Sequence, residues 1–200
     1  MCNHYRTHRE DIADWAEWAG YNLPAAYEIH DDIWPKRPGT IARIVDGEKI
    51  AEAMYWGVPI TIPGKRSGTT ITKHVTNVRN LTSPFWKSML ASPERRCLVP
   101  FSRFAEPKPG KDPETGRPAE YWFTVSNRPV AAFAGVWRPS EAGNVYAFLT
   151  CEPNPLVAPL HPKAMPVILQ EDDYDQWLGG TYDEACALAV PYPSQLMNLA

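Results

Sequence analysis

Apolar residues near the start of the chain recur at the spacing of an α-helix. The face that they would share carries Ile12, Trp15, Ala16 and Ala19. Gly20 follows as a typical stop signal, and residues 7–10, Thr-His-Arg-Glu, have the pattern of a capping box. The pattern therefore predicts a helix that begins within two turns' length of the N-terminus and ends at Gly20.

Apolar and β-branched runs further along predict strands. Residues 40–45 and 49–57 flank Asp46-Gly47-Glu48, and Asp-Gly is a strong turn signal, so we expect a hairpin here. Further strands are expected at residues 96–101, 120–126, 130–137, 144–150 and 164–169. The turn residues between these runs predict an antiparallel sheet at the centre of the protein, and hence a mixed α+β class that is mostly β.

The remaining segments are expected to form short helices and loops. Ser83-Pro84 is a good helix start, Asn154-Pro155 is interpreted as another, and residues 171–180 and 181–190 predict two more helices. Residues 58–72 and 104–119 are rich in Pro and Gly and predict loops, which would put Glu106 at the end of a strand. No repeat or low-complexity tract interrupts residues 1–200, so we expect a single domain.

Composition and charge limit the classes of partner. The chain is 44% hydrophobic and 22% charged, which is ordinary for a globular protein, and its formal charge is −3. This charge excludes a general polyanion binder that works by bulk attraction. Lys and Arg are frequent between residues 36 and 103 whereas Asp and Glu crowd residues 171–184, so a local basic groove is compatible with the sequence.

The four cysteines are widely separated. They are Cys2, Cys97, Cys151 and Cys186. No C-x-x-C or Cys/His cluster has the spacing of metal ligands, so neither a zinc site nor a disulfide framework is predicted, and we expect no cofactor. The first residues lack the apolar core of a signal peptide, and no apolar run approaches the ~20 residues of a membrane span. We therefore expect a cytoplasmic protein without a membrane partner.

Cys2 follows the initiator methionine directly. Removal of Met1 would leave one residue with two nucleophiles, an α-amine of reference pKa ~7.7–8.0 and a thiol of ~8.5. Such a group can attack an amide, as in hydrolases with an N-terminal nucleophile, or condense with an aldehyde to close a five-membered thiazolidine. Either reaction needs a histidine or glutamate to move protons and an amide group to orient the terminus.

Candidates for those tasks are Asn77, Glu106 and His161. Taken singly, Asn77 also fits a turn or cap, Glu106 a solvated loop carboxylate, and His161 a structural or surface histidine. The individual residues therefore leave the reaction open.

A series of short motifs resembles one known family. In chain order they are "MC" (1–2), "RPGT" (37–40), "YWG" (55–57), "TNVR" (76–79), "RRCLVP" (95–100), "FAEP" (104–107), "AFAGVW" (132–137) and "LHPKAMPVIL" (160–169). Their order resembles that of the SOS response-associated peptidase family, whose members crosslink to abasic sites in single-stranded DNA. The resemblance implies a barrel-like antiparallel core with short peripheral helices.

The resemblance also implies roles for individual residues. Cys2 would be the nucleophile, Asn77 would orient the terminal amine or adjoining peptide, Glu106 would be the general acid/base, and His161 would assist proton transfer and hold the opened sugar. Arg79 would contact a DNA phosphate, since its guanidinium can fork onto phosphate oxygens. The same machinery is thought to release Met1 in the family.

At some positions that would contact DNA, the chain departs from the family pattern. Gly-Arg is common after the cysteine, whereas this chain has Asn3-His4, so that phosphate contact is either lost or taken over by His4 or Arg6. Tryptophans are common in the loop that follows Gly57, where Lys65 and Arg66 would supply charge in place of stacking. Two further residues from the motifs, Pro38 and Trp56, are also predicted to contact DNA.

The sequence leaves three hypotheses about the function of the chain. The first is a crosslinking protein of single-stranded DNA, active as a monomer in the cytoplasm and associated with the nucleoid when bound. The second is a cysteine amidohydrolase that turns over a small amide and is indifferent to DNA. The third is a binding domain whose site has decayed. The motif order around Asn77, Glu106 and His161 favours the first.

Overall fold

The Asp-Gly turn forms the hairpin that the sequence predicts. In the computed structural model, which describes residues 2–24, 28 and 30–200, β3 (Pro38–Val45) and β4 (Glu48–Trp56) pair in register from end to end. Asp46 and Gly47 connect them with φ angles of 50° and 86°. Two successive positive φ angles characterise the tight turn whose twist matches that of the strands, and Asp and Gly tolerate them best.

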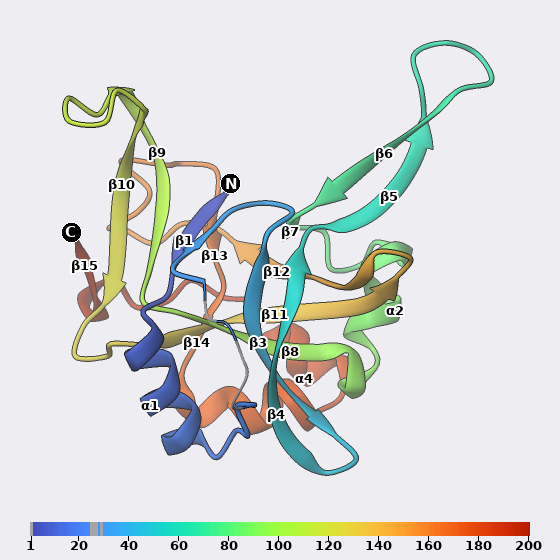
Figure 1. Cartoon of the computed structure of the whole chain (residues 1–200), viewed down its shortest axis with the longest axis horizontal. Coiled ribbons are helices and arrows are strands. Elements are labelled where there is room, and N and C mark those ends of the chain that lie inside the picture. The colour runs from blue at the N-terminus through green and yellow to red at the C-terminus, as the bar shows by residue number, and fades with distance from the viewer. Residues whose placement is uncertain (1, 25–27, 29) are drawn as a thin grey trace.

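This hairpin belongs to a closed ring of strands. The other members are β8 (Arg96–Phe101), β11 (Ala131–Ser140) and β12 (Gly143–Cys151). β3 pairs with β8, β8 with β11 and β11 with β12, all antiparallel, and β12 closes the ring on β4 in a parallel pairing. The fold is therefore mostly antiparallel with a barrel-like core and short helices, as predicted (Figure 1).

Short strands extend this sheet on either side of the ring. They are β7 (Asn77–Val78), β13 (Met165–Pro166) and β14 (Ile168–Leu169). β7 pairs in parallel with β12, and β13 and β14 pair with β12 and β11. The predicted strand at residues 164–169 is thus two strands on different partners, divided at Val167, whose amide N–H donates to the Leu149 carbonyl and whose own carbonyl accepts from Ala134.

A second sheet contains the start of the chain. Its order is β15 (Met197–Leu199), β10 (Pro118–Val125), β9 (Arg103–Lys111), β1 (His4–Arg6) and β2 (Asp32–Ile33). His4 on β1 is opposite Ala105 on β9. This register brings the N-terminal strand alongside the strand that carries Glu106.

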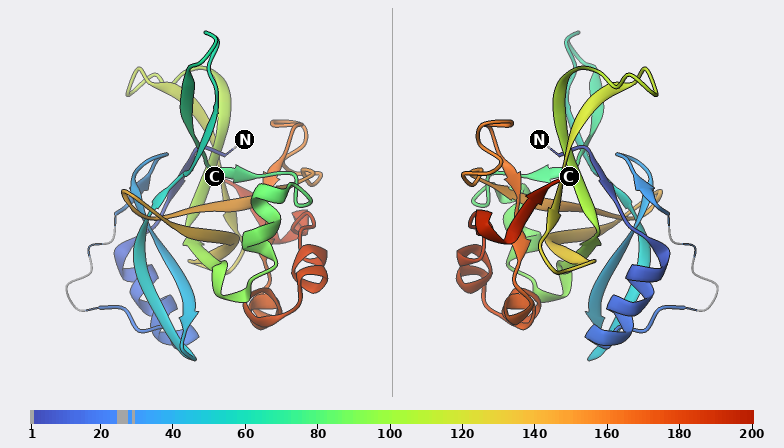
Figure 2. Two further views of the ribbon diagram at one scale, coloured as in Figure 1. Left: turned by 90° about the vertical axis from the view of Figure 1, so that its right-hand side faces the viewer. Right: turned by 90° about the vertical axis from the view of Figure 1, so that its left-hand side faces the viewer.

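The two segments predicted to be loops are largely strands. Residues 58–72 fall mostly in β5 (Val58–Pro63) and β6 (Thr70–Val75), and residues 104–119 fall mostly in β9 and the start of β10. Both pairs project from the same side of the body, with β1 between them (Figures 1 and 2). The loop prediction was wrong because the prolines lie in the projecting parts of these strands, which have a neighbour on one side only, so no second strand needs their missing N–H.

The helices lie at the periphery. They are α1 (Arg9–Ala19), α2 (Pro84–Leu90), α3 (Tyr174–Gly179) and α4 (Tyr182–Ala187), with 3-10 turns η1 (Pro93–Arg95), η2 (Glu171–Asp173) and η3 (Ser194–Leu196). Gly20 ends α1 with φ 75°, as predicted. No described helix has the length and apolar character that crossing a bilayer requires.

Two helix predictions were wrong in detail. The capping box at residues 7–10 does not form: α1 begins after His8 without a side-chain cap, and the Thr7 hydroxyl donates instead to the His30 carbonyl at 2.6 Å. Asn154-Pro155 starts a series of turns rather than a helix, since the Asn154 carbonyl accepts from both Val157 and Ala158. These turns lead directly to His161.

Candidate active site

Cys2 lies in the interior, next to the first strand of the second sheet. Its side chain is fully buried, and its thiol donates to the His4 carbonyl at 3.4 Å. Burial raises the pKa of the thiol well above its usual range, and the negative charge of Glu106 adds to this effect. The thiol is therefore protonated in this state, and a group that accepts its proton is needed before it can act as a nucleophile.

Asn77 holds the backbone of Cys2. β7 places Asn77 opposite Phe148 on β12, and the Asn77 side chain is buried. Its Nδ2 donates to the Cys2 carbonyl at 3.0 Å and to Thr76 Oγ1 at 2.8 Å. Its Oδ1 is buried and has no hydrogen-bond partner among the described residues. An acceptor in this position suits an N–H donor that arrives with a reactant or with a newly freed amine.

Glu106 is a buried carboxyl group with a strongly perturbed acidity. It lies within β9 opposite Tyr121, rather than at a strand end as expected, and only 1% of its surface is exposed. Burial raises its pKa to about 7. A carboxyl group with this pKa exchanges protons readily in both directions near neutral pH, which is what a general acid/base requires.

His161 faces Glu106 from the turns that follow Asn154. Its Nδ1 is 3.4 Å from Glu106 Oε2 and donates to the Ala164 carbonyl at 2.8 Å. Because a carbonyl only accepts, the proton is on Nδ1 and the basic nitrogen of the neutral ring is Nε2. Burial lowers the pKa of His161, which favours this neutral form.

Arg79 supports the turn that carries His161. Its Nη1 donates to the Lys163 carbonyl at 2.6 Å and its Nη2 is paired with Glu152. The side chain is 44% exposed, so part of the guanidinium faces solvent. Arg79 thus links β7 to the His161 turn and also presents positive charge beside the site.

The structure brings the four predicted catalytic residues together from four segments of the chain. Direct contacts join Asn77 to Cys2 and His161 to Glu106, and the charge of Glu106 acts on the Cys2 thiol. The group contains a nucleophile, an orienting amide and two proton-transfer groups. It can support addition to a carbonyl carbon with proton transfer, the step common to amide hydrolysis and thiazolidine formation.

The residues that were predicted to contact DNA differ from one another in their exposure. Lys65 and Arg66 are exposed at the tip of the β5–β6 hairpin, and Pro38 is half-buried at the start of β3. Trp56 is fully buried, donates from Nε1 to the Thr76 carbonyl at 3.0 Å and stacks on Phe148. We therefore no longer interpret Trp56 as a stacking surface for bases.

His4 and Arg6 both interact with carboxylates of the protein. His4 is 4% exposed and its ring nitrogens contact Glu120 and Asp32. Arg6 Nε pairs with Asp32 as well, while its guanidinium lies over the Trp122 ring, 4.7 Å from the centroid. His4 is thus enclosed, whereas Arg6 keeps a partly exposed side chain.

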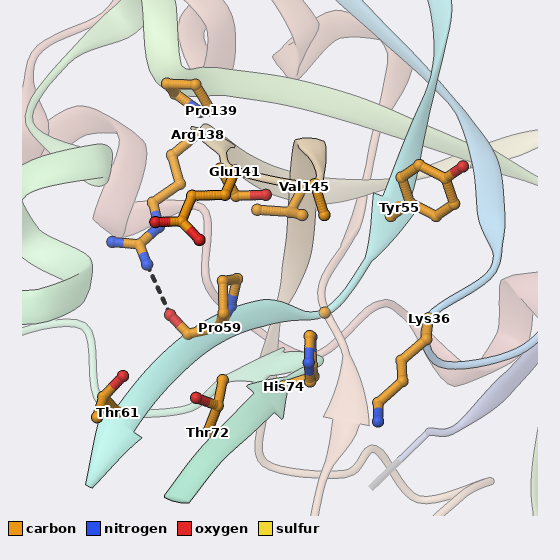
Figure 3. A pocket seen from close by; sticks show the side chains of 13 residues that line it. Lys36, Tyr55, Pro59, Thr61, Thr72, His74, Arg138, Pro139, Glu141 and Val145 are labelled. Atoms are coloured by element: carbon orange, nitrogen blue, oxygen red, sulfur yellow. Dashed lines mark hydrogen bonds between the residues drawn. The ribbon is translucent and has the colours of Figure 1, made fainter. Parts of the chain in front are cut away.

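A cavity of 790 Å³ lies apart from the candidate site, at the base of the β5–β6 hairpin. Lys36, Tyr55, His74 and Arg138 line it, and Arg138 donates to the Pro59 carbonyl at 2.6 Å (Figure 3). None of Cys2, Asn77, Glu106 and His161 lines this cavity. The candidate site therefore lies outside this cavity.

Neighbours of the site that sequence reasoning missed are Thr76, Asp32 and Glu120. Thr76 accepts from the Asn77 amide, and the two carboxylates hold His4. The "TN" of the motif "TNVR" could have indicated Thr76, but no local pattern distinguishes Asp32 or Glu120 from other charged residues. Within residues 2–24, 28 and 30–200, no group of His, Cys, Asp and Glu side chains is arranged to hold a metal ion.

Comparison with known proteins gives one family and a shared fold. A family model described as SOS response associated peptidase (SRAP) matches residues 1–200. No curated protein matches the chain. A crystal structure of a protein from Bordetella bronchiseptica is similar with 24% identity and a TM-score of 0.74, over 100% of this chain and 98% of that chain.

Two further crystal structures are similar to this chain. A protein from Bacteroides thetaiotaomicron is 17% identical with a TM-score of 0.75, over 99% of this chain and 90% of that chain. A phage-related protein from Bordetella bronchiseptica is 19% identical with a TM-score of 0.66, over 100% of this chain and 92% of that chain. At these identities the solved structures establish the shared fold alone.

Proposed function

Because the chain belongs to the SOS response-associated peptidase family, we propose that it crosslinks covalently to abasic sites in single-stranded DNA. Membership itself gives a role associated with DNA damage and, at a general level, peptidase-like activity. The finer proposal is that Cys2, freed by removal of Met1, forms a thiazolidine with the aldehyde of the ring-opened sugar. The observation that supports it best is the buried Glu106, whose pKa of about 7 suits proton transfer beside Cys2.

The reaction requires two bonds to form at one carbon. The α-amine of Cys2 adds to the aldehyde, and loss of one water gives an imine. The thiol sulfur then adds to the same carbon while its proton passes to the nitrogen, which closes the ring. The net change is the release of one water, so neither an oxidant nor a reductant is consumed.

The surrounding residues have complementary tasks in this scheme. The Asn77 amide fixes the carbonyl of Cys2 and thereby the direction of its amine. Glu106 delivers a proton to the departing water and removes one from the thiol. His161 contacts Glu106, and its Nε2 is the basic nitrogen that accepts a hydrogen bond from a hydroxyl group of the opened sugar.

The DNA strand would be held by positive charge near the site. Arg79 is partly exposed beside the His161 turn, and Lys65 and Arg66 lie at the tip of the hairpin that projects on one side of β1 (Figure 1). Guanidinium and ammonium groups attract phosphates without reading sequence, as an abasic-site binder requires.

A denaturing gel tests the proposal. The protein is incubated with a single-stranded oligonucleotide that carries one abasic site, without any reductant. We expect a slower band in the wild type and in Cys186→Ala, a variant of a half-buried cysteine, and no such band in Cys2→Ala. A band that survives in Cys2→Ala, or none in the wild type at low salt, would contradict the proposal.

A further inference from the structure

His4 is held on both sides by carboxylates. Its Nδ1 is 2.9 Å from Glu120 Oε2 on β10, and its Nε2 is 3.0 Å from Asp32 Oδ1 on β2. A carboxylate can only accept, so each ring nitrogen donates and the ring carries two protons and a positive charge. Asp32 is ionised: although its burial acts in the opposite direction, hydrogen bonds from Arg6 and His4 lower its pKa.

The surroundings of the ring exclude water and add further charges. The His4 ring stacks on Trp34 with centroids 3.7 Å apart, and it meets the Trp122 ring edge-on at 4.7 Å. Two cations, Arg6 of β1 and Arg103 of β9, lie over Trp122 at 4.7 and 5.0 Å. The charged groups around His4 are therefore Asp32, Glu120, Arg6 and Arg103.

The backbone of the same residue holds the nucleophile. The His4 carbonyl accepts the hydrogen bond of the Cys2 thiol at 3.4 Å, and His4 is paired with Ala105, the neighbour of Glu106. The position of His4 on the sheet thus determines where the sulfur lies relative to Glu106. The two side-chain contacts of His4 attach this short strand to β2 and to β10.

We propose that His4 is a positioning residue for Cys2. The ring of His4 is bound by Asp32 and Glu120, and these contacts fix the strand that carries the nucleophile. The proposal rests on the proposed function for its catalytic consequence. It replaces the expectation that His4 contacts a DNA phosphate, because an enclosed ring with both nitrogens engaged has no donor left for one.

The first measurement needs no DNA. The rate at which iodoacetamide alkylates Cys2 is followed by mass spectrometry of the N-terminal peptide in wild type, His4→Ala and His4→Arg. We expect His4→Ala to raise this rate about 10- to 100-fold, the factor for a lost hydrogen bond between charged groups. His4→Arg keeps a cation with several donors and should restore slow alkylation. Glu48→Gln, an exposed carboxylate of β4, is the control.

Rescue by His4→Arg separates positioning by the two contacts from general structural support. Hydrogen exchange of the amides of residues 4–6, corrected for intrinsic rates and measured at one pH, should be faster in His4→Ala than in the wild type. It should stay slow in His4→Arg, whose guanidinium has donors for both carboxylates. If His4→Ala fails to fold, Glu120→Gln and Asp32→Asn, which preserve side-chain size, replace it in both measurements.

The outcomes are distinct. Unchanged alkylation in His4→Ala, or a His4→Arg variant that behaves like His4→Ala, overturns the role of His4. Crosslinking to abasic DNA is then measured in the same variants, and we expect it to fall in His4→Ala and recover in His4→Arg. Absence of crosslinking in the wild type overturns the proposed function alone, because alkylation and exchange still decide the role of His4.

Discussion

The amide nitrogen of Asn77 donates a hydrogen bond of 3.0 Å to the carbonyl oxygen of Cys2. The two residues are 75 positions apart in the chain. Pairing of β7 with β12 places Asn77, and pairing of β1 with β9 places the strand that follows Cys2. The contact fixes the peptide that joins Cys2 to Asn3, so the geometry of the site depends on it.

Asn77→Ala should slow crosslinking and also destabilise the fold. The substitution leaves the buried Cys2 carbonyl without its donor, which costs about 1–3 kcal/mol. Gel-based rates and thermal melts of the variant measure both effects. Asn198→Ala is a matched control, since it removes an exposed side-chain contact to Ser126 at 3.1 Å. Equal rates in the two variants would exclude an orienting role for Asn77.

Glu106→Gln should remove a pH dependence of stability. Between the ordinary glutamate pKa of about 4.3 and about 7, the folded state holds a proton that the unfolded state has lost. The free energy of unfolding of the wild type therefore falls as the pH rises through this window. The stability of Glu106→Gln relative to wild type should increase by on the order of 3 kcal/mol over the same window.

Urea melts at a series of pH values measure this difference. A stability difference that is constant with pH would mean that Glu106 titrates normally. The same variant should also lose crosslinking by about 10²- to 10⁴-fold, the usual contribution of a general acid/base.

Lys65→Gln and Arg66→Gln should weaken DNA binding without changing the chemistry of Cys2. Each lost phosphate contact reduces the slope of log affinity against log salt by roughly 0.7 for single strands. Fluorescence anisotropy at several salt concentrations measures the slope. Arg9→Gln removes an exposed charge from α1, away from both projecting hairpins (Figure 1), and should leave the slope unchanged.

Trp56→Phe should affect stability rather than DNA binding. The substitution removes the Nε1 donor to the Thr76 carbonyl and leaves space in the core, at a cost of about 2–4 kcal/mol. Urea melts measure the cost, and anisotropy measures the affinity of the folded variant for single-stranded DNA. A loss of affinity in a fully folded variant would restore Trp56 as a contact.

The strands of the ring and the turn at Asp46-Gly47 could be predicted because local patterns specify them. The projecting hairpins could not, since prolines such as Pro59 and Pro107 indicate loops unless that part of the strand is known to have a neighbour on one side only. Their place on either side of β1 becomes visible only in the folded structure (Figure 1).

The four catalytic candidates could be predicted from a nucleophile that is specific to the terminus and from motif order. The surroundings of His4 could not. Its partners Asp32 and Glu120 are 28 and 116 positions away, so its burial depends on a sheet that the sequence does not reveal locally. Trp56 similarly becomes a core residue through Thr76 and Phe148.

Mass spectrometry of the DNA adduct tests the crosslinking proposal most directly. The gel-purified adduct is digested with nuclease and protease, and the N-terminal peptide is sequenced. We predict a peptide that lacks Met1 and carries the sugar remnant on Cys2, with the mass of one water lost. A remnant on a lysine, or on a peptide that retains Met1, would contradict the proposed reaction.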